Sequence, residues 1–132
     1  MMTERDGFQL ELCSVTIEDL VPNDHFLRKL ESAVDFSFIY DEVRDLYCED
    51  NGRPGIDPVV LIKYLLIGFL YGILSERWIE AELQVNMAYR WFLGLNISER
   101  VPDHSTISQN RRRRWGAKTC AGVFLRGYWP CV

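Results

Sequence analysis

Between residues 23 and 46, apolar residues recur every three or four positions, the spacing that places them on one face of a helix. The first stripe predicts a helix after Pro22, capped by the side-chain oxygen of Asn23 or Asp24. The second predicts a short helix over residues 36–46, capped by Asp35. The two stripes consist of Phe26, Leu27, Leu30 and Val34, then Phe36, Ile39, Val43 and Leu46. Residues 1–21 alternate polar and apolar without strong periodicity.

An almost uninterrupted apolar run covers residues 59–74, and Asp57-Pro58 precedes it. Asp caps helices well, and Pro at the first helical position loses no hydrogen bond that the helix needs. The run has 16 residues, fewer than the ~20 that span a bilayer, and it contains Lys63. A charge at the membrane centre costs at least roughly 2.5 kcal/mol. We therefore predict a central core helix that ends near Gly72, with a membrane span as the less favoured interpretation.

Three more helical segments follow the apolar run. Ser75 can cap a helix over residues 76–85, whose apolar face consists of Trp78, Ile79, Leu83 and Val85. A break at Asn86 starts a segment over residues 86–93, and Gly94 is a common C-terminal stop. After a loop, Asp103 or Ser105 caps a last helix that continues to Trp115.

Strand signals are nearly absent, so the predicted fold class is all-α, a compact helical bundle. The helices at 58–74, 76–85 and 86–93, followed by a basic helix at 104–115, are compatible with helix-turn-helix-like DNA-binding character. The turn before the last helix is longer than the usual three or four residues. A chain of 132 residues allows one domain, and 48% hydrophobic content excludes a disordered tail.

The net charge of −4 conceals an asymmetry along the chain. Residues 1–50 carry 4 basic and 13 acidic side chains, whereas residues 51–132 carry 11 basic and 6 acidic ones. A basic C-terminal face could meet a polyanion. The four cysteines lack the close pairing of zinc or redox sites, and no signal peptide opens the chain. We therefore expect reduced thiols, a cytoplasmic protein and no metal site.

The last predicted helix carries the candidate DNA-binding residues. Its hydroxyl and amide side chains suit hydrogen bonds to phosphates and base edges, and four consecutive arginines follow. The candidates are Ser105, Thr106, Ser108, Gln109, Asn110, Arg111, Arg112, Arg113 and Arg114. The arginines span a full helical turn, so we expect about two of them to reach phosphates. The alternative is a solvated basic helix end that favours the helix dipole.

No catalytic residue is predicted. Asp103-His104-Ser105 contains the residue types of a hydrolase triad, but three adjacent residues cannot form its line of hydrogen bonds. We expect His104 to be a structural or capping residue. Glu76, Glu80 and Glu82 have no evident His partner on their helix and are expected to face solvent. The aromatics Trp78, Tyr89, Trp91 and Phe92 are expected to pack in the core rather than stack on bases.

Taken in order, several segments resemble the N-terminal domain of bacterial insertion-sequence transposases. The resemblance covers roughly residues 8–115 and depends on Gly55-Ile-Asp-Pro58, Ser75-Glu-Arg77 with Ile79-Glu-Ala-Glu-Leu83, Tyr89-Arg-Trp-Phe-Leu-Gly94 and Val101-Pro-Asp-His-Ser-Thr-Ile-Ser108 with the following arginines. It also includes Val21-Pro22, Asp24-His-Phe-Leu-Arg-Lys-Leu30 and Phe36-Ser-Phe-Ile-Tyr40. Such a domain implies DNA binding at the ends of the element, ahead of a ribonuclease-H-like catalytic domain of the DDE type. There, three acidic residues hold divalent metals.

The chain departs from this family after Trp115. We expect a transposase N-terminal helical domain at residues 1–115, truncated before the catalytic domain, and an atypical tail at 116–132. A frameshifted reading frame would produce such a tail, and a deliberately short product is the alternative. No catalytic residue or cofactor is therefore carried over to this chain. The leading hypothesis is a module that recognises double-stranded DNA at transposon ends. The alternative is a helical interaction module that forms a homo-oligomer or binds full-length transposase. Salt distinguishes the two, because phosphate contacts weaken steeply with salt.

Overall fold

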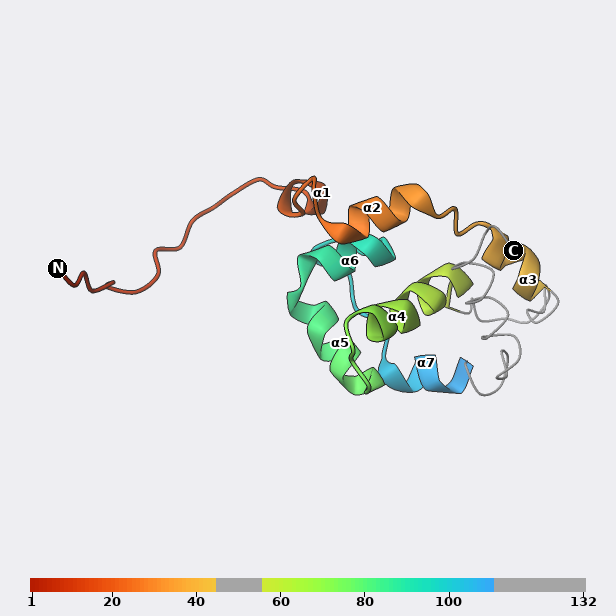
Figure 1. Cartoon of the computed structure of the whole chain (residues 1–132). Coiled ribbons are helices and arrows are strands. Elements are labelled where there is room, and N and C mark those ends of the chain that lie inside the picture. The colour runs from red at the N-terminus through yellow and green to blue at the C-terminus, as the bar shows by residue number, and fades with distance from the viewer. Residues whose placement is uncertain (45–55, 111–132) are drawn as a thin grey trace.

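The computed structural model describes residues 1–44 and 56–110, and in these ranges it contains helices and no strand. The helices are α1 (Ile17–Leu20), α2 (Phe26–Ala33), α3 (Phe38–Val43), α4 (Pro58–Leu70), α5 (Glu76–Val85), α6 (Met87–Leu93) and α7 (His104–Asn110). The N-terminal segment before α1 extends away from the helical body (Figure 1). The all-α prediction is confirmed.

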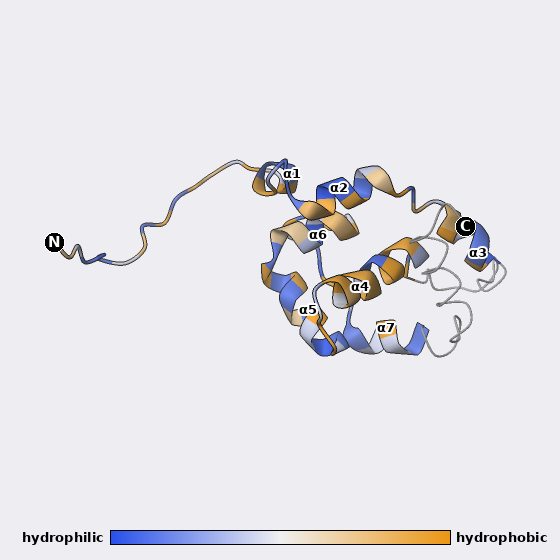
Figure 2. Ribbon diagram, viewed as in Figure 1, coloured by the Kyte–Doolittle hydropathy of each residue, from blue (hydrophilic) through white to orange (hydrophobic). Residues whose placement is uncertain are grey.

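Helix α4 lies at the centre of the bundle and is the most apolar helix (Figure 2). It contacts α3, α5 and α6, while α1 and α2 pack on α6 and α7 packs on α5 (Figure 1). Leu61, Tyr64 and Ile67 of α4 are fully buried. The predicted core helix is therefore confirmed, and none of the described helices has the length and apolarity needed to cross a membrane.

Local signals place several helix ends. Asp57 caps α4 by accepting a hydrogen bond from the Val59 amide, and Pro58 is its first residue. Asn86 caps α6 by accepting from the Tyr89 amide at 3.2 Å. Gly94 ends α6 with a φ of +81°, a left-handed conformation that favours glycine. The predicted cap at Asp57, the break at Asn86 and the stop at Gly94 are confirmed, and the capping role of Asn86 is an addition.

The caps predicted for the first two helices are wrong. The imidazole of His25, rather than Asn23 or Asp24, accepts the Leu27 amide at 3.1 Å and caps α2. Asp35 accepts the Ser37 amide in a turn before α3, which begins only at Phe38. Helix α1 was not predicted, although a capping box between Thr16 and Asp19 starts it.

The aromatic residues divide between core and surface. Tyr89 and Phe92 are buried, as predicted, and Trp91 is half-buried beneath the Arg28 guanidinium. The core prediction is wrong for Trp78, which is 52% exposed and donates its indole N–H to Glu82 at 3.2 Å. Val85, predicted for the same apolar face, is also exposed. Helix α5 buries only Ile79 and Leu83, a narrower stripe than its composition suggests.

Candidate nucleic-acid interface

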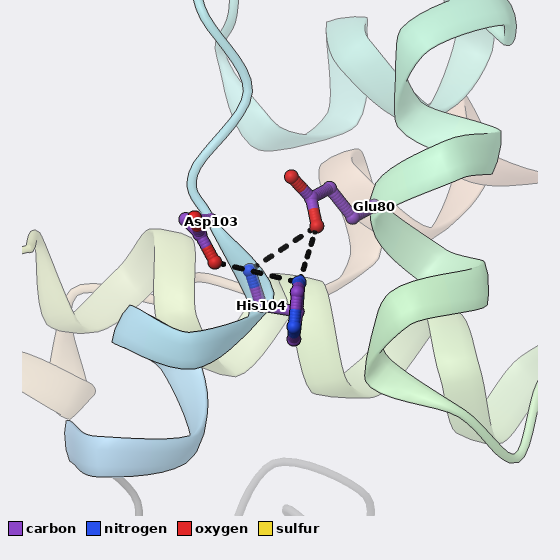
Figure 3. A group of neighbouring side chains, drawn as sticks. All are labelled: Glu80, Asp103 and His104. Carbon is purple, nitrogen blue, oxygen red and sulfur yellow. Dashed lines mark hydrogen bonds and ion pairs between the residues drawn. The ribbon is translucent and has the colours of Figure 1, made fainter.

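Helix α7, the described part of the predicted basic helix, is fixed to α5 by two contacts between side chains. The Ser108 hydroxyl donates a hydrogen bond to the Glu76 carboxylate. Four residues earlier in α7, His104 Nδ1 lies 2.6 Å from Glu80 Oε2 (Figure 3). Residues four apart in a helix share a face, so both contacts lie on the facing sides of α5 and α7. The earlier residue of α5 meets the later residue of α7, so the two contacts follow the two helices in opposite chain directions.

We call these two contacts, Glu76–Ser108 and Glu80–His104, the α5–α7 ladder. Fully buried Ile107 lies between the positions of the two α7 residues and adds an apolar contact to the same interface. From α4, the Tyr64 hydroxyl donates to the Glu76 carbonyl oxygen at 2.6 Å, and burial raises the pKa of Tyr64. The start of α5 is thereby held by both α4 and α7.

The ladder corrects the expectation for the acidic residues of α5. Glu76, Glu80 and Glu82 are half-buried rather than solvent-facing, and Glu80 has a His partner 24 residues away in the chain. That partner is His104, whose predicted structural role is consistent with this contact. Each carboxylate accepts at least one hydrogen bond, from Ser108, His104 and Trp78 in turn. Hydrogen bonding offsets the cost of burying such groups.

The loop that returns the chain to α7 is held by a buried arginine. Arg90 of α6 is 5% exposed, and its Nη1 donates to the Asn96 carbonyl at 3.0 Å and to the Glu99 carbonyl at 2.8 Å. Leu95 and Val101 anchor the two ends of this loop in the core. This role of Arg90 was not predicted, although a single charge among the mostly apolar residues of α6 was a usable signal.

A second set of hydrogen bonds surrounds the first residues of α7. Arg77 Nε donates to His104 Nε2 at 3.2 Å, so the neutral imidazole carries its proton on Nδ1 and donates it to Glu80. Asp103 Oδ1 accepts from both the amide and the hydroxyl of Ser105, at 2.7 and 2.8 Å. These bonds lower the pKa of Asp103, with a smaller contribution from the positive charge of Arg100. Asp103 thus caps α7, as predicted.

Glu80, Asp103 and His104 are also residues that could together hold a divalent cation, since their ligand atoms lie within 4.8 Å of one another (Figure 3). In the described arrangement those atoms are engaged with protein groups. A cation bound to His104 Nδ1 would remove the proton that this nitrogen donates to Glu80. The ring proton would then be on Nε2, which could no longer accept the hydrogen bond from Arg77. Hydrogen bonding accounts for the geometry, and we assign the cluster to the docking of α7.

The structure describes five of the nine predicted DNA-binding residues. Ser105, Thr106 and Gln109 are exposed, and they share one face of α7 because Gln109 follows the other two by four and three positions. Ser108 and Asn110 are half-buried; Ser108 donates to Glu76, and the Asn110 side-chain amide donates to the Thr106 carbonyl at 2.8 Å. Arg111, Arg112, Arg113 and Arg114 lie outside the described residues, as does the predicted helix up to Trp115.

Comparison with known proteins gives one result. A family model described as Transposase domain (DUF772) matches residues 15–113, which include every described helix. No curated protein and no solved structure matches the chain.

Proposed function

The chain belongs to the Transposase domain (DUF772) family, and from this premise we propose that it is the DNA-binding module of an insertion-sequence transposase. It corresponds in this proposal to the N-terminal part of a DDE-type enzyme, acts in the cytoplasm and recognises transposon-end DNA without cleaving it. The observation that carries the proposal is the exposed face of Ser105, Thr106 and Gln109 on a helix that the α5–α7 ladder holds in place. A helix that is held in this way, as in helix-turn-helix proteins, is suited to bind in the major groove of DNA.

The charges around α7 are compatible with an approaching polyanion. Glu76 and Glu80 accept hydrogen bonds from α7 itself, and Asp103 accepts two from Ser105. Their negative charge is therefore partly compensated inside the protein before DNA approaches. The four arginines that follow Asn110 in the sequence supply the positive charge that phosphate binding requires.

Helical spacing divides these arginines into two pairs. Arg112 and Arg113 follow exposed Gln109 by three and four positions, whereas Arg111 and Arg114 follow buried Ile107 by four and seven. If the period of α7 continues, as the sequence predicts, the first pair shares the exposed face and the second does not. We expect Arg112 and Arg113 to be the two phosphate contacts.

A salt titration of binding to a mixed-sequence DNA duplex tests this proposal. Each phosphate contact contributes about 0.9 to the slope of log affinity against log salt concentration. Replacing Arg112 and Arg113 by Ala should lower the slope by about 1.8, while the same change at Arg111 and Arg114 should leave it nearly unchanged. Arg44→Ala, which removes a charge from the exposed end of α3, serves as the matched control.

Base recognition is measured separately, by competition among duplex sequences. Gln109→Ala or Asn110→Ala should reduce the preference for the best duplex by roughly 1–3 kcal/mol if either side chain contacts a base edge. A variant that lacks all four arginines, keeps its helical circular dichroism spectrum and retains the wild-type salt slope would refute DNA binding through this helix.

One observation favours a second candidate, a protein-interaction module that dimerises or binds full-length transposase. Phe8, Leu10 and Leu12 alternate with polar residues in the extended N-terminal segment, and all three are fully exposed (Figure 1). Such alternation is typical of a segment that pairs with another chain. Sedimentation of the wild-type protein and a Leu10→Pro, Leu12→Pro variant tests this candidate. A concentration-dependent oligomer that the prolines abolish would support it, and a monomer throughout would exclude self-association.

A further inference from the structure

Arg77 lies in the first turn of α5, next to the first residue of α7, and its side chain is exposed. Its guanidinium uses only one of five N–H donors within the described part of the chain, from Nε to His104 Nε2 at 3.2 Å. The Nη1 and Nη2 end of the planar group therefore retains its hydrogen-bonding capacity. The exposed part of α7 begins at Ser105, directly after His104.

His104 restricts the orientation of this guanidinium. Its ring accepts from Arg77 at Nε2 and donates to Glu80 at Nδ1, so the three side chains form a continuous chain of hydrogen bonds. Glu80, three residues after Arg77 in α5, contacts the other ring nitrogen, Nδ1 (Figure 3). A long exposed side chain normally loses conformational entropy when it binds a ligand. Part of that loss already occurs in the folded protein here.

We infer that Arg77 is a phosphate-binding residue of the α7 interface and that His104 and Glu80 are its positioning residues. The inference deepens the proposed function and rests on it. The guanidinium fork matches a phosphate group, and its contact with His104, the first residue of α7, places it near the start of that helix. One contact of this kind fixes the register of a protein on a duplex without reading its sequence.

The surrounding charges set how much Arg77 can contribute. Glu76, Glu80 and Asp103 are carboxylates of this region, and each accepts a hydrogen bond from a protein donor, Ser108, His104 and Ser105 respectively. Arg100 is a second cation close enough to lower the pKa of Asp103. Positive and negative side chains therefore lie together around the start of α7, and we expect Arg77 to act as a single oriented contact rather than as part of a basic patch.

The first measurement is the salt slope of binding to a mixed-sequence duplex. Arg77→Ala should lower the slope by about 0.9, the value of one phosphate contact, and Arg77→Lys should restore most of it. Arg44→Ala again controls for the loss of one charge at another surface. If the wild-type protein shows no salt-dependent binding, the proposed function itself fails. If it binds and Arg77→Ala keeps the wild-type slope, only the role of Arg77 is refuted.

The second measurement separates positioning from docking by a double-mutant cycle in DNA affinity. His104→Ala should weaken binding when Arg77 is present and have a smaller effect in the Arg77→Ala background, because the orientation of Arg77 is then irrelevant. His104→Gln, whose amide can accept from Arg77 and donate to Glu80, should recover part of the affinity. Equal effects of His104→Ala in both backgrounds would overturn the positioning role and leave His104 with docking alone.

Discussion

Lys63 lies in the middle of the most apolar helix and is 7% exposed. Its Nζ forms a 2.7 Å ion pair with Glu31 of α2, and it lies 4.8 and 4.9 Å from the ring centres of Phe36 and Phe92. The methylene stem fills space in the core while the ammonium is compensated by a carboxylate and two aromatic faces. This residue therefore joins α2 and α4 and the aromatic residues around them.

Removing either partner of this pair should have unequal effects on stability. Glu31→Ala leaves a buried ammonium without its carboxylate and should lower the free energy of unfolding by about 1–3 kcal/mol, reduced because Glu31 is 39% exposed. Lys63→Met fills the same volume with an apolar chain, and Glu31 can then turn to water, so we expect a loss below about 1.5 kcal/mol. Urea unfolding measures both values, and a larger loss for Lys63→Met would contradict this account.

At the scale of elements, α4 and α5 approach each other at Gly68. A Cβ at this position would lie 2.7 Å from Ile79 Cδ1 and 3.1 Å from the Ile73 carbonyl oxygen. Glycine inside a helix costs up to about 1 kcal/mol relative to alanine, yet here it permits the close crossing. The residue is retained for packing, and the helix forms because its apolar side chains are buried.

Gly68→Ala should therefore destabilise the protein by about 1–2 kcal/mol, since overpacking outweighs the gain in helix propensity. Ile79→Val removes the methyl group that the new Cβ would meet, so its own cost, roughly 0.5–1.5 kcal/mol, should shrink in the Gly68→Ala background. Thermal unfolding of the four proteins in this cycle checks the coupling. A stabilising Gly68→Ala would show that the two helices can separate without cost.

Particular elements show how far the sequence could predict this fold. Asp57, Asn86 and Gly94 act on their own helices, so neighbouring residues sufficed to place three helix ends. The cap of α2 was mispredicted because Asn23, Asp24 and His25 are adjacent candidates, and tertiary packing selects among them. Single-helix patterns could not indicate that Trp78 faces solvent, since both faces of α5 carry bulky residues.

The contacts that hold the candidate interface were less predictable from the sequence than its helix ends. Its exposed residues were predicted from composition, but the contacts that hold them were not, because Glu80 and His104 lie 24 residues apart and their pairing depends on the loop that Arg90 holds. No local pattern predicts which residues such a loop brings together. The contact between Arg77 and His104 was missed for the same reason, since its two residues belong to different helices.

Across the whole molecule, carboxylates near helix starts make folding sensitive to acid. The pKa of Glu18 is lowered mainly by Arg28, and those of Asp19, Asp35 and Asp103 mainly by backbone amides. A carboxyl whose pKa is lower in the folded state stabilises the fold fully above its unfolded value, about 4, and loses that effect as the pH falls through the folded value.

The melting temperature should thus be nearly constant from neutral pH down to about pH 5 and fall steadily below about pH 4. Asp103→Asn removes one of these groups and should flatten the decline, while lowering stability at neutral pH because the α7 cap is weakened. Scanning calorimetry across this range provides the test. A melting temperature that rises as the pH falls would be opposite to this prediction. It would show that protonation of these carboxylates does not control the acid stability of the protein.

The α5–α7 ladder also determines the axial position of α7 relative to α5. A shift of one helical turn, about 5.4 Å, toward the C-terminal end of α5 would place His104 opposite Gln84 and Ser108 opposite Glu80. The opposite shift would place His104 opposite Glu76 and Ser108 opposite Gly72, which precedes α5. Either displacement retains at most one carboxylate contact. The two contacts together therefore select one axial position of α7 relative to α5.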